Sequence, residues 1–132
     1  MGIDYGTKRV GIAVSDPLQI ITTALDTIAT EKALDFIKKY CLEEEVEQFV
    51  IGEPRHKDGN PTYVTPLVHQ FIEELNKALP NIPVATWDES FSSSEAKRTI
   101  LAAGYKKKQR QDKALVDRIS AAIILREYMD RY

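Results

Sequence analysis

The sequence predicts an α/β protein with a mixed five-stranded sheet flanked by helices, and three observations carry this prediction. Two short β-prone runs flank the turn Gly6-Thr7-Lys8, which is typical of a β-hairpin. Two short apolar runs, residues 49–52 and 82–87, alternate with segments of helical periodicity. The resulting order of strands and helices is β-β-β-α-β-α-β-α-α. An antiparallel three-stranded meander is therefore joined to two parallel strands by right-handed crossovers.

Size and composition favour one domain over residues 1–132. Hydrophobic residues make up 43% of the chain and charged residues 29%, as is ordinary for a globular protein. The single Cys41 excludes an internal disulfide and a cysteine-cluster zinc site, fits a reducing compartment, and is expected to be a buried structural thiol. With no long apolar run and no signal peptide, we expect a cytoplasmic protein without a membrane span. The net charge of −2 argues against coating nucleic acid by bulk charge.

The opening strand contains one residue that does not fit a strand, the carboxylate Asp4. Aspartate is depleted in strands, and an unpaired buried charge costs several kcal/mol. A metal ion or a basic partner would offset that cost, whereas a solvated position or hydrogen bonds from turn N–H groups would avoid it. After the hairpin, Pro17 marks a turn, and residues 20–28 are rich in Ile, Thr and Leu, which predicts the third strand.

The middle of the chain alternates helices and strands. Thr30 is expected to cap a helix that runs to about Glu45. The run 49–52 predicts a strand buried on both faces. The next helix extends to Leu79 and begins at Thr62 or nearer Thr65, because Pro66 is tolerated only in a first turn. Residues 82–87 then predict the fifth strand.

Two further helices close the chain. Ser92 and Glu95 form a capping-box pattern for a helix that reaches Ala103, with Gly104 after it. A basic loop follows, and its cations are Lys106, Lys107, Lys108 and Arg110. The last helix is predicted from Lys113 to about Tyr128.

Acidic residues occur where sites of open α/β sheets collect, beyond the carboxyl ends of strands. Asp4 lies on the first strand, Asp88-Glu89 ends the fifth, and Asp117 lies near the start of the last helix. Each also has a purely structural explanation, since Asp117 can complement a helix N-terminus and Glu89 can cap the following helix. Their joint position is what makes them candidates for a shared site.

Four motifs in series give the chain a family resemblance. They are GIDYGTKRVGIAVSD (2–16), GEP (52–54) with Asp58-Gly59, DESFSS (88–93) with Glu95-Ala96, and KALVD (113–117) leading into SAAIIL (120–125). In order and spacing they resemble the YqgF family (the RuvX-type proteins), relatives of the RuvC Holliday-junction resolvases in the ribonuclease H-like superfamily. The resemblance implies a ribonuclease H-like fold for nearly the whole chain.

The same resemblance implies that Asp4, Glu89 and Asp117 correspond to acidic residues that hold catalytic metal. Two divalent ions can activate a water and stabilise the leaving oxygen of a phosphodiester, and carboxylates suit Mg²⁺ or Mn²⁺. In this scheme Asp4 is the bridging ligand. Phosphate contacts are expected from the cations of the opening turn and of the basic loop, namely Lys8, Arg9, Lys106, Lys107, Lys108 and Arg110.

Three departures from the family pattern bear on these expectations. Ser90 stands where the family usually has an arginine that could grip phosphate or a carboxylate. Glu53 replaces an apolar residue and is either an extra ligand or a surface residue, of which the surface position is favoured. Only three residues precede Asp4, whereas the first strand of the family is typically longer, so either this strand is short or the sequence begins late.

The leading functional hypothesis is a metal-dependent nuclease acting on structured nucleic acid, and the resemblance points to 5′-end maturation of precursor 16S ribosomal RNA in the cytoplasm. A DNA junction resolvase is an alternative, and the sequence does not separate RNA from branched DNA. A non-catalytic nucleic-acid-binding or ribosome-assembly factor with a weak metal site is another alternative, which Ser90 makes less remote. A phosphotransferase related to actin and hexokinase ranks last, because 132 residues leave no second domain to close over a nucleotide.

Overall fold

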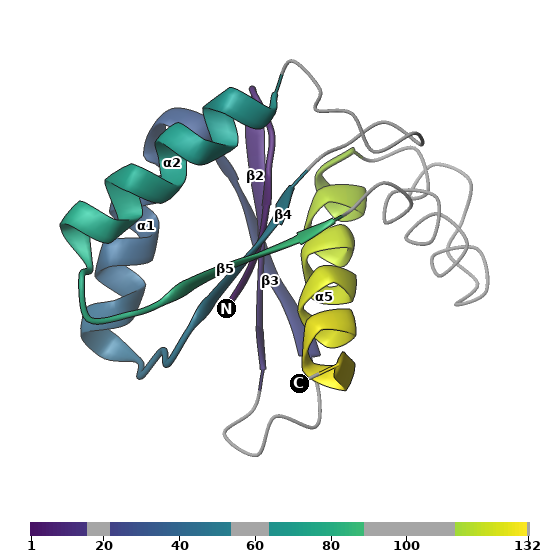
Figure 1. The fold of residues 1–132 in the computed structure, drawn as a ribbon. Helices are drawn as coiled ribbons and strands as arrows, with labels where there is room; N and C mark the ends of the chain where they lie inside the picture. The colour runs from purple at the N-terminus through teal and green to yellow at the C-terminus, as the bar shows by residue number, and fades with distance from the viewer. Residues whose placement is uncertain (16–21, 54–63, 89–112, 132) are drawn as a thin grey trace.

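The computed structural model describes residues 1–15, 22–53, 64–88 and 113–131. Five strands form one sheet in the order β3-β2-β1-β4-β5 (Figure 1). The strands are β1 (Gly2–Tyr5), β2 (Arg9–Ser15), β3 (Thr22–Ala29), β4 (Phe49–Glu53) and β5 (Val84–Asp88). Strands β1, β2 and β3 pair antiparallel, whereas β4 runs parallel to β1 and β5 parallel to β4. The predicted mixed sheet, an antiparallel meander followed by two parallel strands, is confirmed.

Three helices flank the sheet within the described residues: α1 (Thr30–Glu43), α2 (Thr65–Ala78) and α5 (Lys113–Arg131). Helix α2 begins at the later of its two expected starts, with Pro66 in the first turn where its missing N–H costs nothing. Helix α1 ends two residues earlier than expected, and α5 continues three residues further. The expected helix 92–103 and the loops around residues 17, 54–63 and 104–112 lie outside the described residues.

The prediction that Thr30 caps α1 is wrong. The N-cap residue is Ala29, and it makes no side-chain capping bond. The Thr30 hydroxyl instead donates to the carbonyl oxygen of Gly6 at 2.7 Å, and its backbone N–H donates to that of Lys8 at 3.1 Å. A threonine that satisfies the carbonyls of a neighbouring turn is not free to cap its own helix. The start of α1 is thereby tied to the β1–β2 turn.

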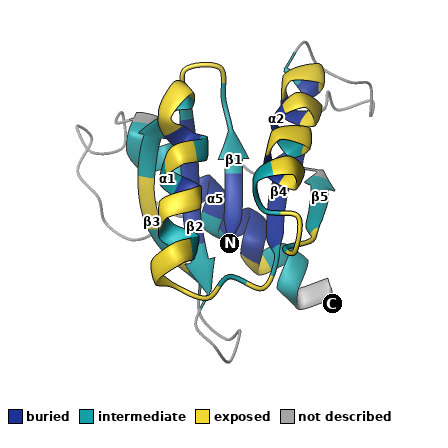
Figure 2. Cartoon of the chain, turned by 90° about the vertical axis from the view of Figure 1, so that its left-hand side faces the viewer, coloured by how far each residue is buried: buried dark blue, intermediate teal, exposed yellow. Residues whose placement is uncertain are grey.

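Helices α1 and α2 cover one face of the sheet, and α5 covers the other (Figures 1 and 2). The main core lies under α1 and α2 and contains the side chains of Ile3, Val10, Ile12, Ile37, Phe49, Ile51, Val68, Phe71 and Leu75, each at most 4% exposed. Cys41 packs against this core but is only partly buried. Strand β4 is buried along its whole length, as its apolar run predicts.

Helix α5 crosses the opposite face diagonally, from β3 and β2 at its start to β4 and β5 at its end. The hydroxyl of Thr27 on β3 donates to the carbonyl oxygen of Ala114 at 2.6 Å. Near the other end, the indole N–H of Trp87 on β5 donates to Glu127 at 2.8 Å, and the Trp87 ring meets that of Tyr128 edge-on. Hydrogen bonds at both ends of α5 therefore fix its position on the sheet.

Glycines allow the middle of α5 to lie close to the strands. A Cβ on Gly2 would stand 2.6 Å from the carbonyl oxygen of Ala121 and 2.8 Å from Cβ of Leu125. A Cβ on Gly11 would collide with the backbone carbonyl of Asp117. Because the helix backbone lies so close to the strands at these two positions, only glycine fits there without displacing the helix.

Within the described part of the chain, no helix has both the length and the apolar character needed to cross a membrane.

Candidate active site

Asp4 lies on the face of the sheet that α5 covers. Successive side chains of a strand point to opposite faces. Ile3 and Tyr5 belong to the α1/α2 face, where the Tyr5 ring lies 5.1 Å from that of Phe71. Gly2 faces α5, so Asp4, two residues further along β1, faces α5 as well. Asp4 is partly buried rather than fully enclosed, which lowers the cost of its charge.

The structure places the backbone of Asp117 over the row of residues that contains Asp4. Across the sheet, Asp4 is paired with Gly11, and Gly11 is paired with Thr27, so the three residues form a row on the α5 face. Ala114 of α5 is bonded to Thr27, and the backbone of Asp117 lies directly on Gly11. Asp4 is the next position in this row. Two acidic residues from opposite ends of the chain therefore come close together where the carboxyl end of the central strand β1 lies.

An arginine holds the Asp117 carboxylate. Arg9 Nε donates to Asp117 Oδ2 at 2.7 Å, with side-chain exposures of 37% for Arg9 and 23% for Asp117. Arg9 is the first residue of β2 and shares the α5 face with Gly11, two residues on. The sequence predicts only a phosphate contact for Arg9, so its pairing with Asp117 is a finding of the structure. The short distance marks a charge-assisted bond.

A cavity of about 260 Å³ opens beside this pair. It is lined by Tyr5, Val64, Asp117 and the β1–β2 turn, residues 6–9. Lys8 is exposed in that turn. The cavity thus combines one carboxylate of the candidate site with two cations.

The favoured surface position of Glu53 is wrong. Its side chain is buried, and Oε1 lies 3.0 Å from Nε2 of His69 on α2. Glu53 follows Phe49 and Ile51 at alternate positions of β4, and both of those side chains belong to the core under α1 and α2. Glu53 therefore lies on the opposite face from Asp4. The alternation along residues 49–53 was the sequence signal that could have revealed this.

The third candidate ligand, Glu89, lies outside the described residues, and so do Lys106, Lys107, Lys108 and Arg110. The chain leaves β5 at Asp88, which is paired with Glu53 at the same edge of the sheet. In the described part of the chain, no three His, Cys, Asp or Glu side chains gather closely enough to hold a metal ion. That part supplies two carboxylates, Asp4 and Asp117.

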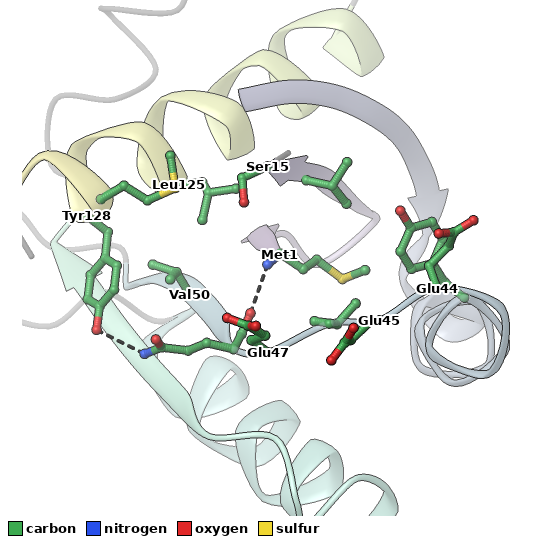
Figure 3. A pocket seen from close by; sticks show the side chains of 13 residues that line it. Met1, Ser15, Glu44, Glu45, Glu47, Val50, Leu125 and Tyr128 are labelled. Carbon is green, nitrogen blue, oxygen red and sulfur yellow. Dashed lines mark hydrogen bonds between the residues drawn. The ribbon is translucent and has the colours of Figure 1, made fainter. Parts of the chain in front are cut away.

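A larger cavity of about 570 Å³ lies at the opposite end of the sheet (Figure 3). Its walls include Val50, Leu125 and Tyr128, and its rim carries the exposed Glu44, Glu45 and Glu47. Tyr128 accepts a hydrogen bond from the Gln48 side chain at 2.9 Å. An acidic rim repels a phosphate backbone, so this cavity does not suit nucleic acid.

A mixed sheet in this order, with a helix laid across one face and carboxylates at the edge where β1 ends, is consistent with the ribonuclease H-like class. Residues 1–131 match the model of the RuvX family, which is described as Holliday junction resolvase. The chain belongs to the RuvX family, as the resemblance of its motifs implied.

Individual relatives agree with this assignment. A protein of Flavobacterium psychrophilum is 44% identical over 131 residues, covering 99% of this chain and 96% of that protein. Proteins of Bacteroides fragilis and Porphyromonas gingivalis are 48% and 47% identical over 130 residues, covering 98% of this chain and 94% of each relative. All three carry the name "Putative pre-16S rRNA nuclease".

Proposed function

We propose that this chain is a metal-dependent nuclease that hydrolyses phosphodiester bonds in structured RNA, at the 5′ end of precursor 16S ribosomal RNA in the cytoplasm. The observation that carries the proposal is that Asp4 faces α5 and that the backbone of Asp117 lies on Gly11, the residue paired with Asp4. The names of the relatives support the substrate and the reaction. One domain over residues 1–132 would hold the whole site.

The donor set fits a hard divalent ion. Carboxylate oxygens are the ligands that Mg²⁺ and Mn²⁺ prefer, and a divalent ion bound by two partly buried carboxylates lowers their mutual repulsion. Asp4, Asp117 and Glu89 would hold the ions. When bound, two such ions activate a water and stabilise the leaving oxygen of a phosphodiester.

The chain's own residues have distinct parts in this reaction. Helix α5 places the backbone of Asp117 on β2, and the missing side chain of Gly11 allows the helix to lie that close. The exposed Lys8 in the β1–β2 turn would contact the backbone phosphates, as would Lys106, Lys107, Lys108 and Arg110. Such contacts fix the register of the substrate without reading its sequence.

Cleavage of branched DNA is a second candidate, because the family that matches the chain is described as Holliday junction resolvase. A factor that binds nucleic acid without cutting it is a third candidate, because Ser90 replaces an arginine that could have held a neighbouring carboxylate of the metal site. Only an assay with both substrates separates these functions.

The test is cleavage of a structured RNA spanning the 5′ end of 16S ribosomal RNA, and of a four-way DNA junction, with Mg²⁺, Mn²⁺ or a chelator. We expect RNA cleavage with metal, and its loss in Asp4→Asn. Glu53→Gln is the matched control, since Glu53 is a carboxylate at the same edge but on the other face. Cutting of the junction alone would favour the resolvase, and binding without cutting would favour the binding factor.

A further inference from the structure

The ion pair between Arg9 and Asp117 uses only part of the arginine. Arg9 meets Asp117 through Nε alone, at 2.7 Å. A guanidinium carries five N–H donors, four of which belong to the two terminal nitrogens. These terminal nitrogens make no hydrogen bond to the residues that the structure describes. Arg9 therefore keeps most of its donors while it holds Asp117.

The surroundings of this arginine are suited to an anion. Arg9 and Asp117 both line the cavity of about 260 Å³ beside the β1–β2 turn. Lys8, also in the lining, is exposed and adds a second positive charge. No further carboxylate lines this cavity among the described residues. The cavity is large enough for a phosphate group, and its described lining residues carry a net positive charge.

We propose that Arg9 is a positioning residue that bridges the site, holding Asp117 through Nε while its terminal nitrogens bind a backbone phosphate of the substrate. This inference rests on the proposed nuclease function and goes beyond it. The bridge would orient the carboxylate relative to the phosphate that is cut. It also gives the arginine two roles that can be measured separately.

Lysine can replace the charge of Arg9 but not its geometry. A planar guanidinium binds two partners in a fixed fork, whereas an ammonium is a point charge on a flexible stem. A side chain that orients a metal-binding carboxylate typically contributes 10- to 100-fold to metal affinity. A phosphate contact contributes roughly 0.7–0.9 to the slope of log K against log salt. Arg9→Lys and Arg9→Gln thus separate the two roles.

The experiment measures Mn²⁺ binding by calorimetry and binding of the structured RNA at several salt concentrations, without catalysis. For Arg9→Gln we expect Mn²⁺ affinity about 10-fold weaker and a salt slope lower by roughly 0.7–0.9. For Arg9→Lys we expect the same loss of Mn²⁺ affinity, with the salt slope kept. Lys38→Gln removes a charge from the exposed side of α1 and should change neither quantity. Circular dichroism checks that each variant is folded.

Three results would overturn the bridge. Wild-type Mn²⁺ affinity in Arg9→Lys would show that only charge matters at this position. A wild-type salt slope in Arg9→Gln would show that Arg9 does not bind phosphate. Tighter Mn²⁺ binding in Arg9→Gln would show that the guanidinium opposes the ion. Failure of wild-type protein to bind Mn²⁺ would instead refute the proposed metal site, while the salt slopes would still report on the phosphate contact.

Discussion

Substitution of Gly11 by alanine tests whether the close approach of α5 to the sheet positions Asp117. A Cβ at residue 11 would overlap the carbonyl group of Asp117, and the nearest atoms all belong to backbone. Backbone cannot rotate away as a flexible side chain can. The first turns of α5 must therefore move off β2, and Asp117 must move with them.

The size of the effect follows from the overlap. Ordinary van der Waals contact begins at 3.4 Å, and the Gly11 overlap exceeds that of Gly2, whose Cβ would stand 2.6 Å from Ala121 O. Overpacking of this kind destabilises the fold by about 1–3 kcal/mol. Replacing glycine by alanine also lowers the conformational entropy of the unfolded chain, which stabilises the fold by about 0.4–1 kcal/mol. A net loss of about 1–2 kcal/mol corresponds to a melting temperature lowered by roughly 4–8 °C in a chain of this size.

Thermal melting and Mn²⁺ titration of the same samples provide the assay, with Gly2→Ala as the matched control. Both variants crowd α5, but Gly2 lies under Ala121 and Leu125, one turn or more from Asp117. We expect both to lower the melting temperature and Gly11→Ala to lower Mn²⁺ affinity more strongly. A Gly11→Ala protein with wild-type stability and affinity would refute the packing argument. Equal losses of affinity in both variants would show that only stability is affected.

Three further predictions concern residues around this arrangement. Thr27→Val should cost about 1 kcal/mol of stability in chemical denaturation, because the hydroxyl that bonds Ala114 O is lost. Glu53→Gln should leave Mn²⁺ affinity unchanged in calorimetry, because Glu53 pairs with His69 on the other face; a weaker affinity would place Glu53 in the metal site. Burial raises the pKa of the Cys41 thiol, so less thiolate is present at a given pH. Alkylation by iodoacetamide at pH 8 should thus be slower in folded than in urea-unfolded protein, and equal rates would contradict this.

The sheet was predictable from local sequence because its strands have distinct patterns. The turn at residues 6–8 fixes a hairpin, and the buried run at residues 49–52 fixes a central parallel strand. The start of α2 followed from Pro66, whose ring is excluded from a helix interior. These are effects of neighbouring residues, which a single sequence contains in full.

The details of the site depend on contacts between distant segments and were less accessible. The role of Gly11 becomes clear only when α5 is laid on β2. The pairing of Arg9 with Asp117 joins residues from both ends of the chain. Thr30 was misassigned because its hydroxyl finds a carbonyl of the β1–β2 turn. The charge of Glu53 indicated a solvent-exposed position, but its side chain is buried and interacts with His69 on α2.

The proposed metal site, in which Asp4 and Asp117 hold a divalent ion where β1 ends, can be located by NMR. Paramagnetic Mn²⁺, added below stoichiometry to ¹⁵N-labelled protein, broadens the amide signals of residues near the ion. We predict broadening centred on Asp4, Gly11 and Asp117, and its loss in Asp4→Asn. Broadening centred instead on the acidic rim at Glu44 and Glu47, or no localised broadening, would contradict a metal site at Asp4 and Asp117.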